Sequence, residues 1–371
     1  MKKLTWIGLI LLAATYCNNR IRAKMLWTTP YRVRTQKTSQ PLGVPRQNFD
    51  ASVLSSGKLS AIFRVAKPVK TRSPFIPLIC ALATASAPSA SPGAGIFDRE
   101  NLVAWCIVPF DAKKRGPEER EAMLERLGIK HFAYDWRAEH VPTFETEIQA
   151  MKRHGVEFTA FWGTHEEAFK LFEKYGLKPQ LWVMLPKVEA PTPEECVKQA
   201  AQKMLPLVER ARKLGCPVAF YNHGGWGGEP ENMVAVAKLL REQHGAANVG
   251  IVYNLHHGHD HLDRFPAALA LMKPYLLCLN LNGMMKDGDK RGMKILPLGQ
   301  GDLDLSLLKT IRDSGYQGRI GVLNHTGEDA EARLKDNLEG LAWLVPQLDG
   351  KTAGPKPQPA SWRLPAPPKP N

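Results

Sequence analysis

From residue 97 onward, apolar and polar positions follow one order that repeats along the chain. Each repeat holds a short apolar run, a polar stretch, a segment with apolar residues three and four positions apart, and in most cases a glycine. The short runs predict buried strands, and the longer segments predict amphipathic helices. The predicted strands are 102–109, 131–136, 157–162, 180–185, 217–223, 249–254, 275–282 and 319–325, and the predicted helices are 117–127, 142–153, 165–175, 193–214, 230–243, 262–273, 304–314 and 328–345.

The predicted helices carry start and stop signals. Six are followed by a glycine that can take the left-handed conformation which ends a helix: Gly128, Gly155, Gly176, Gly215, Gly245 and Gly315. Thr192, Asp263 and Asp304 are predicted N-caps. Strict alternation of strand and helix requires a parallel sheet, and eight units in roughly 250 residues favour a closed barrel over a doubly wound sheet. We therefore predict an α/β fold with a single (β/α)8 TIM barrel at 97–349.

Polar and aromatic residues gather where the predicted strands end. Chemistry in such barrels lies at the C-terminal ends of the strands. The candidates there for binding a substrate are Asp135, Trp162, Asn222, Trp226, Asn254, Asn280, Asn282 and His325. In the seventh strand Leu277, Leu279 and Leu281 alternate with Cys278, Asn280 and Asn282, which predicts that the amides face the interior. A polyhydroxylated ligand would satisfy such buried amides.

Four segments resemble a known family. They are AFYNHGGWGG, YNLHHGH, LNLNG and LPLGQGDLDLSLLKTIRDSGYQG, and in this order they resemble the xylose isomerase-like barrels, which include sugar isomerases, sugar epimerases, inosose dehydratases and endonuclease IV. The resemblance covers residues 100–345. It implies a divalent cation held by Glu, Asp, His and Glu on strands five to eight. These positions carry Tyr221, Asn254, Asn280 and Leu323 here, a poor donor set for a hard cation, so the family's metal is in doubt and no cofactor is assigned.

Histidines dominate the remaining chemistry. His257 matches a histidine that supports the metal site in the family, and with His223 or His256 it is the predicted acid–base pair. A relocated metal site on His256, His257 and His259 is an alternative, although histidines that only donate hydrogen bonds in a polar cleft are the commoner case. Asp135 and Glu189 are the carboxylates best placed to act as acid or base.

The function that these residues predict is proton transfer next to the carbonyl of a sugar or keto-sugar, as in an isomerase, an epimerase or a lyase. The alternative is a non-catalytic carbohydrate-binding barrel that has lost the metal site. A glycosidase would need a pair of carboxylates at strand ends, which the sequence does not indicate. A small carbohydrate is thus the expected partner. The sequence does not specify the sugar or the oligomeric state.

The net charge of +14 changes little once its distribution is considered. Residues 1–70 hold 13 of the 50 Lys and Arg and one acid, Asp50, so the rest of the chain is nearly neutral and a nucleic-acid partner is not expected. Residues 1–17 and 67–95 both resemble export signals. We expect that translation starts near Val65 or Val69, that 1–66 is a doubtful leader, and that 67–95 directs export to the periplasm or the medium. The alternative is an N-terminal membrane anchor with a tether.

Two smaller features complete the prediction. Beyond the export segments the chain has only Cys106, Cys196, Cys216 and Cys278, and their spacing fits neither a zinc ribbon nor a disulfide framework. We therefore expect buried free thiols. Residues 350–371 are rich in proline and predict a flexible or polyproline tail. No membrane span beyond the export signal is expected, because the apolar runs are short.

Overall fold

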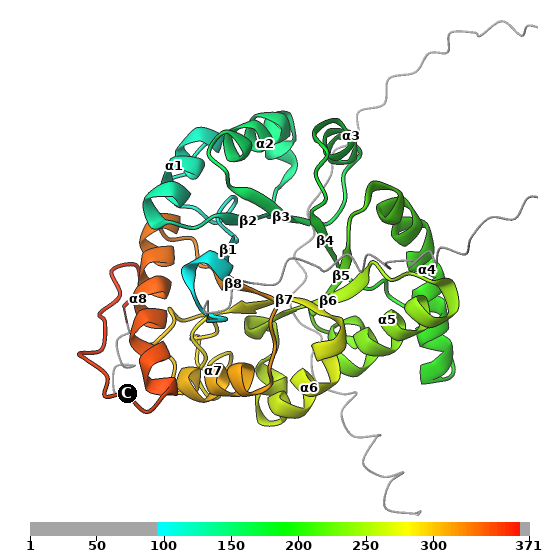
Figure 1. The fold of residues 1–371 in the computed structure, drawn as a ribbon. Coiled ribbons are helices and arrows are strands. Elements are labelled where there is room, and N and C mark those ends of the chain that lie inside the picture. The colour runs from blue at the N-terminus through cyan, green and yellow to red at the C-terminus, as the bar shows by residue number, and fades with distance from the viewer. Residues whose placement is uncertain (1–94, 364–371) are drawn as a thin grey trace, which may run out of the picture. The chain divides into compact units, whose positions relative to one another are not determined.

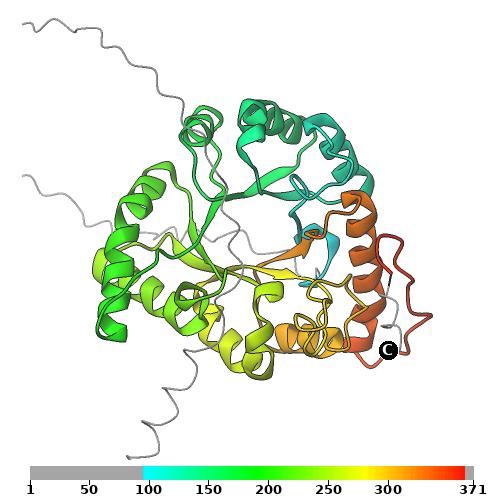
Figure 2. The same cartoon turned by 180° about the vertical axis from the view of Figure 1, so that it is seen from behind.

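The repeat along the chain folds into a closed barrel. In the computed structural model, which describes residues 95–363, eight parallel strands pair in chain order and the last pairs with the first. The strands are β1 (Leu102–Trp105), β2 (His131–Tyr134), β3 (Glu157–Trp162), β4 (Gln180–Val183), β5 (Val218–Tyr221), β6 (Val249–Asn254), β7 (Leu276–Leu281) and β8 (Arg319–Leu323). The α-helices are α1 (Pro117–Leu127), α2 (Phe144–Arg153), α3 (Glu166–Tyr175), α4 (Pro193–Leu214), α5 (Pro230–His244), α6 (Phe265–Met272), α7 (Asp304–Asp313) and α8 (Ala330–Leu348). Figures 1 and 2 show these helices as a ring around the strands, which confirms the predicted (β/α)8 TIM barrel.

Helix ends agree with the sequence except at two caps. The six glycines predicted to end helices all have positive φ, between 61° and 74°. Thr192 caps α4 by accepting the Glu195 N–H at 3.2 Å. Asp263 was predicted wrongly as a cap, because 259–264 forms a 3-10 turn and α6 begins only at Phe265.

Asp304 is the other correction at a helix start. It is the first residue of α7, after Leu303, and its carboxylate does not cap that helix. The carboxylate accepts the backbone N–H groups of Met284, Gly299 and Gly301 at 2.6, 2.7 and 3.0 Å. Asp304 therefore fastens the long loop between β7 and α7 beside the barrel mouth.

The core has two layers, which follow from the alternation of side chains along each strand. Odd positions of β1 such as Val103 and Trp105 point inward, and Leu102 and Ala104 point outward to the helices. Inside the barrel large aromatic residues (Trp105, Trp182 and Tyr221) are packed against small ones (Ala133, Ala160 and Ala219). The rings of Trp105 and Trp182 meet edge to face at 4.7 Å. The interior is thus a packed core below the mouth, and not a pore.

The seventh strand departs from simple alternation. Cys278 and Asn280 face the interior as predicted, and Leu279 and Leu281 pack toward the helices. Leu277, predicted to pack with those leucines, instead packs against the interior cluster. The cause is a shift in the pairing of β6 with β7, where Ile251 pairs with Leu276 but Val252 pairs with Cys278.

The segment after α8 lies against the barrel. The Trp343 indole donates to the Gly354 carbonyl at 2.9 Å, and the Asp336 carboxylate accepts the N–H groups of Ala360 and Ser361 at 2.9 and 2.8 Å. Figure 1 shows this segment, in red, beside α8. Residues 350–361 are therefore docked through hydrogen bonds. The last part of the predicted tail, from 364, lies outside the described residues, as do the predicted leader and the export signal up to 94.

The described residues show two further properties. Cys106, Cys216 and Cys278 are buried free thiols as expected, and Cys196 is half-buried. None of the helices within residues 95–363 combines the length and apolar character needed to cross a membrane.

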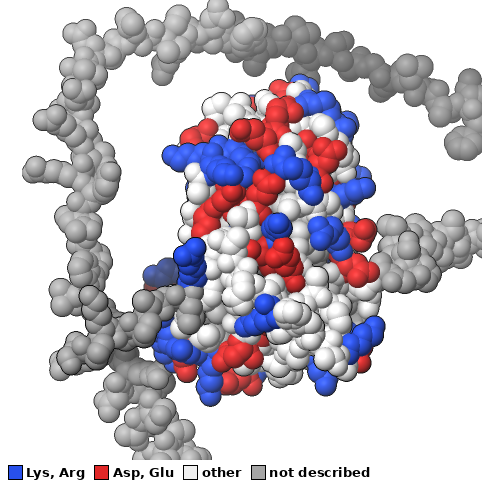
Figure 3. All heavy atoms as spheres, turned by 90° about the vertical axis from the view of Figure 1, so that its left-hand side faces the viewer, with Lys and Arg blue, Asp and Glu red and all other residues white. Residues whose placement is uncertain are grey.

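On the face formed by α1 and α8, basic and acidic side chains are interspersed (Figure 3), with ion pairs such as Arg126–Glu331 at 2.9 Å.

Candidate functional site

A small cavity opens at the C-terminal end of the strands, the end where barrel enzymes carry their chemistry. Its lining comes from the ends of β1, β2, β3, β5, β6 and β8: Trp105, Cys106, Phe110, Asp135, Arg137, Trp162, Tyr221, His223, His257 and His325. Its volume is about 70 Å³. Ligand pockets usually measure about 300–1,000 Å³, so a sugar enters only if part of this wall moves.

Asp135 is the one carboxylate that lines the cavity. It follows β2 directly, is 2% exposed, and lies beside the thiol of Cys106. Within residues 95–363 neither of its carboxylate oxygens has a hydrogen-bond partner. Burial raises the pKa of Asp135 to about 8, against the opposing effect of the Arg137 guanidinium. The group is therefore neutral or half-ionised near neutral pH, when an ordinary aspartate would be fully charged.

The histidines form a second part of the site. The rings of His223 and His257 lie 4.5 Å apart, those of His256 and His257 lie 3.7 Å apart, and His325 lies 5.2 Å from His256. Burial lowers the pKa of His257 to about 3, helped by the charges of His223 and Lys294. The pKa values of His256 and His325 are also lowered, mainly by burial. The imidazoles of His256, His257 and His325 are therefore neutral at physiological pH, and a neutral imidazole has one N–H donor and one acceptor nitrogen.

Aromatic rings and one cation form the remaining wall. Trp162 packs edge to face on Tyr221 at 4.7 Å, and Phe110 lies 3.9 Å from the His325 ring. Arg137 lies 5.4 Å above the Phe110 ring and donates to the carbonyls of Asp135 and Trp136. Within residues 95–363 no carboxylate pairs with Arg137, so its charge faces the cavity.

The backbone is strained at Cys106, directly after β1. Its φ is 60°, in the left-handed region that costs a residue with a side chain about 1–3 kcal/mol. The Asn324 amide holds this turn by donating to the Cys106 carbonyl at 3.0 Å. Burial, with Asp135 next to it, raises the pKa of the Cys106 thiol. The thiol is consequently protonated and supplies a weak donor rather than a nucleophile.

The amides predicted to bind a substrate are buried and are not among the residues that line the cavity. Asn222 joins β5 to β6, because its amide donates to the Asn254 carbonyl at 3.1 Å and accepts the Asn254 N–H at 2.7 Å. Asn282 donates to the Gly283 carbonyl at 2.9 Å. Of these four amides, as far as residues 95–363 show, only the Asn280 amino group and the Asn282 carbonyl oxygen lack partners. Alternation did not predict that such amides bond to the backbone of neighbouring residues.

The four positions that hold the metal in the resembled family come together, but their side chains do not suit a cation. The Asn254 amide donates to the Tyr221 hydroxyl, and its oxygen accepts from His256 Nδ1 at 2.7 Å. The Asn280 oxygen accepts from the Cys278 thiol at 3.4 Å, and Leu323 packs in the apolar interior. Burial raises the pKa of Tyr221 well above its ordinary value, so it is not a phenolate. A divalent cation finds no anionic oxygen in this set.

Three further predicted residues lie away from the cavity. Trp226 packs against the outer core layer, and its carbonyl accepts from Asn232. His259 Nε2 bonds the Lys294 carbonyl at 2.9 Å, and Glu189 is exposed and paired with Lys187 at 2.9 Å. Conversely, sequence reasoning did not select Cys106, Phe110 or Arg137 as lining residues. Cys106 directly follows β1, so the expectation that chemistry lies at the C-terminal ends of the strands also applies to this residue.

Comparisons with known proteins agree with the geometry. A sequence profile described as xylose isomerase-like TIM barrel matches residues 135–346. A D-tagatose 3-epimerase-like protein aligns with a TM-score of 0.50 and 12% identity, over 67% of this chain and 98% of its own. A protein of Sinorhizobium meliloti 1021 aligns with a TM-score of 0.50 and 14% identity, over 67% and 99%. The 3-keto-D-glucoside 4-epimerase of E. coli aligns with a TM-score of 0.48 and 16% identity, over 66% and 99%. No curated protein shows a significant match to the sequence.

Proposed function

The chain belongs to the xylose isomerase-like TIM barrel family, and from this premise we propose that it transfers a proton on the carbon next to the carbonyl of a sugar or keto-sugar. A solved structure with the same fold carries the name of a D-tagatose 3-epimerase-like protein. The fold itself fits many chemistries, so the proposal rests on the cavity. The observation that carries it is the pairing of an unpartnered buried carboxyl, Asp135, with neutral imidazoles at the mouth of the barrel.

The two kinds of group have complementary roles. A carboxyl with a pKa of about 8 is, once ionised, a stronger base than an ordinary aspartate, and its pKa is close to the working pH as proton transfer requires. Asp135 removes the proton from the carbon beside the carbonyl, and the electron pair of that C–H bond forms an enediolate. His257 or His223 donates an N–H to the enediolate oxygen. Return of the proton to the neighbouring carbon, while the hydroxyl proton passes between the two oxygens through the imidazole, isomerises the sugar. If the enediolate turns over so that its other face meets Asp135, return of the proton to the first carbon epimerises it.

This scheme assigns no step to the family's divalent cation. Neutral imidazoles that donate to a developing oxyanion are an established substitute for a charged electrophile in enzymes of this kind. Asp135 therefore takes the place of His256 as the base, since the buried imidazole of His256 hydrogen-bonds Asn254 and does not line the cavity. Trp162 and Phe110 offer aromatic faces to a sugar ring. The relocated metal site on His256, His257 and His259 remains a proposal of lower rank, because His259 points to Lys294.

The replaced cation ligands and the small cavity favour a second candidate function. A barrel that kept the cleft and lost the cation would bind carbohydrate without converting it. Both candidates require Trp162 and Arg137 to contact the ligand. Only the enzyme requires the ionised Asp135.

Hydrogen exchange distinguishes the two functions. The protein is incubated with a panel of aldoses, ketoses and sugar acids in D2O, and deuterium at the carbon beside the carbonyl is followed by NMR. We expect incorporation with at least one sugar. Asp135→Asn should lower the rate by about 10²–10⁴-fold, the usual contribution of a general base. Glu189→Gln, which removes an exposed carboxylate, is the matched control and should exchange like the wild type. Binding with no exchange for any sugar would establish the non-catalytic barrel.

We also propose that the mature protein acts outside the cytoplasm. The support is the apolar segment within 67–95 and the small residues after it. The intact mass of the native protein should correspond to a chain that begins between Ala83 and Gly95. A mature chain that retains residues 20–60 would contradict both the export site and the expected late start of translation.

A further inference from the structure

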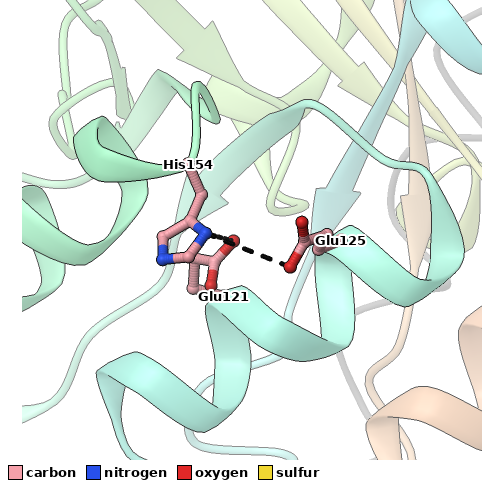
Figure 4. Close-up of side chains that lie close together, drawn as sticks. All are labelled: Glu121, Glu125 and His154. Carbon is pink, nitrogen blue, oxygen red and sulfur yellow. Dashed lines mark ion pairs between the residues drawn. The ribbon is translucent and has the colours of Figure 1, made fainter.

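A second cluster of metal-ligating side chains lies at the opposite end of the barrel. α1 and α2 each run from the mouth down to the end where the next strand begins. Glu121 and Glu125 lie one turn apart, in the middle and the last turn of α1, and His154 directly follows α2. Figure 4 shows the imidazole of His154 facing the two carboxylates. This is the only group of three His, Cys, Asp or Glu side chains with converging ligand atoms within residues 95–363.

The distances suit a small divalent cation. His154 Nδ1 lies 3.3 Å from Glu121 Oε1 and 4.0 Å from Glu125 Oε2, and all three ligand atoms lie within 4.8 Å of one another. Zn²⁺ binds nitrogen and oxygen at about 2.0–2.2 Å in tetrahedral geometry, which places neighbouring ligand atoms about 3.3–3.5 Å apart. The first pair already has this separation. The second needs only a small rotation of the exposed Glu125 side chain.

Burial of Glu121 is the independent sign that something binds here. Its side chain is 2% exposed, and within the described chain its Oε1 atom has no hydrogen-bond partner although it points at His154. A buried carboxylate without a partner is costly, and buried charges are normally paired or bind metals. No Lys or Arg among residues 95–363 forms an ion pair with Glu121 or Glu125, since the nearby Arg153 is taken by Glu118.

The donor atoms of the cluster suit the same ligand. Glu121 and Glu125 offer carboxylate oxygens and His154 offers an imidazole nitrogen. A divalent cation bound between them supplies Glu121 Oε1 with the partner it lacks. One imidazole and two carboxylates form a donor set that suits Zn²⁺.

We propose that Glu121, Glu125 and His154 form a Zn²⁺ site that joins α1 to the end of α2, with water in the remaining coordination position. The site is separate from the cavity at the barrel mouth and takes no part in the proposed proton transfer. Its role is to fasten two neighbouring helices at the end of the barrel that serves stability.

Zinc titration of the full-length, untagged protein tests the site. The chelator-treated protein is titrated with Zn²⁺ by calorimetry, and its melting temperature is measured with and without the metal. We expect saturable binding and a higher melting temperature. His154→Gln and Glu125→Gln should each weaken binding by about tenfold or more, because even the loss of a group that supports a ligand costs about 10–100-fold.

Two control variants establish whether the bound zinc lies at this cluster. Glu118→Gln lies on the same helix, contributes no ligand, and should bind Zn²⁺ like the wild type. His257→Ala removes a histidine at the barrel mouth and should also leave this binding event unchanged. The absence of Zn²⁺ binding, or binding unaffected by both His154→Gln and Glu125→Gln, would overturn the proposal. In the first case His154 simply forms an ion pair with the two glutamates when protonated.

A spectroscopic probe keeps the test valid if a variant is less stable. Co²⁺ replaces Zn²⁺ in such sites and is paramagnetic, so it should broaden and shift the His154 ring signals in the NMR spectrum of the wild-type protein. The result needs no variant. Signals of His154 that stay unchanged while Co²⁺ binds elsewhere would contradict the assignment.

Discussion

At the scale of single residues, the proposed chemistry depends on a carboxyl that the fold leaves without a partner. Asp135 is buried beside the Cys106 thiol, and burial raises its pKa to about 8 against the opposing effects of the Arg137 charge and of nearby backbone groups. Such a residue lowers stability in exchange for reactivity, a pattern common in active sites. The histidines around it are kept neutral by the same burial.

The raised pKa of Asp135 predicts opposite pH effects on activity and stability. The ionised form is the base, so kcat/KM for exchange should rise as pH increases through about 8. The folded protein holds this proton up to about pH 8, whereas the unfolded chain releases it near its ordinary value of 3.8. The unfolded state therefore binds fewer protons in between, and the contribution of Asp135 lowers the free energy of unfolding as pH rises from about 4 to about 8.

Asp135→Asn isolates this effect. The variant cannot ionise, so at pH 8 it should be more stable than the wild type by on the order of a few kcal/mol, because the raised pKa of Asp135 lowers the stability of the wild type there. Near pH 4 the two should agree. Urea unfolding at both pH values measures the difference. Equal stability of the two proteins at pH 8, or a variant that is less stable there, would mean that Asp135 is already ionised and satisfied.

The residues of the cavity were predictable in part. The rule of strand ends selected Asp135, Trp162, His223, His257 and His325, and all five line the cavity. It also selected four asparagines that are buried outside the cavity lining, because periodicity gives the face of a strand and not the hydrogen bonds that its side chains make. Phe110 and Arg137 were not selected, since they belong to irregular segments whose path a periodic pattern does not describe.

At the scale of elements, eight strands and eight helices were predicted in the right order, because each unit buries one apolar stripe and ends on a stop signal. The errors lie where tertiary contacts override local pattern. Asp304 has the sequence of a helix cap but binds the loop before α7, and the bulge between β6 and β7 turns Leu277 inward. Such contacts join residues that are distant in sequence, so no local window reveals them.

At Gly340 two opposing effects decide how a substitution changes the stability of the protein. Gly340 lies inside α8, where alanine normally stabilises a helix by about 1 kcal/mol relative to glycine. A Cβ atom at this position would lie 1.9 Å from the Leu298 carbonyl oxygen, which is backbone and cannot rotate away. Overpacking of this kind costs about 1–3 kcal/mol, so Gly340→Ala should destabilise the protein. Lys335→Ala, on the exposed side of the same helix, is the control and should change stability by less than about 0.5 kcal/mol.

At the scale of the whole molecule, the barrel is closed and its outer helices carry mixed charge. The strong positive charge of the sequence belongs to residues 1–70, outside the described residues. The net charge of the whole sequence therefore does not describe the barrel, whereas the distribution of charge along the chain does. For the proline-rich segment after α8, the sequence predicted less structure than the segment has. Its composition predicts a tail, but hydrogen bonds to α8 hold it in place.

Asp336 should control whether that segment stays docked. Its carboxylate accepts the N–H groups of Ala360 and Ser361, and Asp336→Ala removes both bonds. We expect faster cleavage by trypsin after Lys351, which is exposed and followed by Thr352, with the barrel still intact by circular dichroism. Glu339→Ala, an exposed change on the same helix, is the control. Cleavage at the same rate in all three proteins would show that the segment is held by other contacts.

The central proposal is that this barrel moves a proton on a sugar with Asp135 and neutral histidines, without the family's divalent cation. The decisive measurement is deuterium incorporation from D2O into a responsive sugar, with and without a chelator, for the wild type and for Asp135→Asn. We expect incorporation that the chelator leaves unchanged and that the substitution lowers by about 10²–10⁴-fold. Incorporation that stops with the chelator and recovers with added metal, or that continues unchanged in Asp135→Asn, would contradict this proposal.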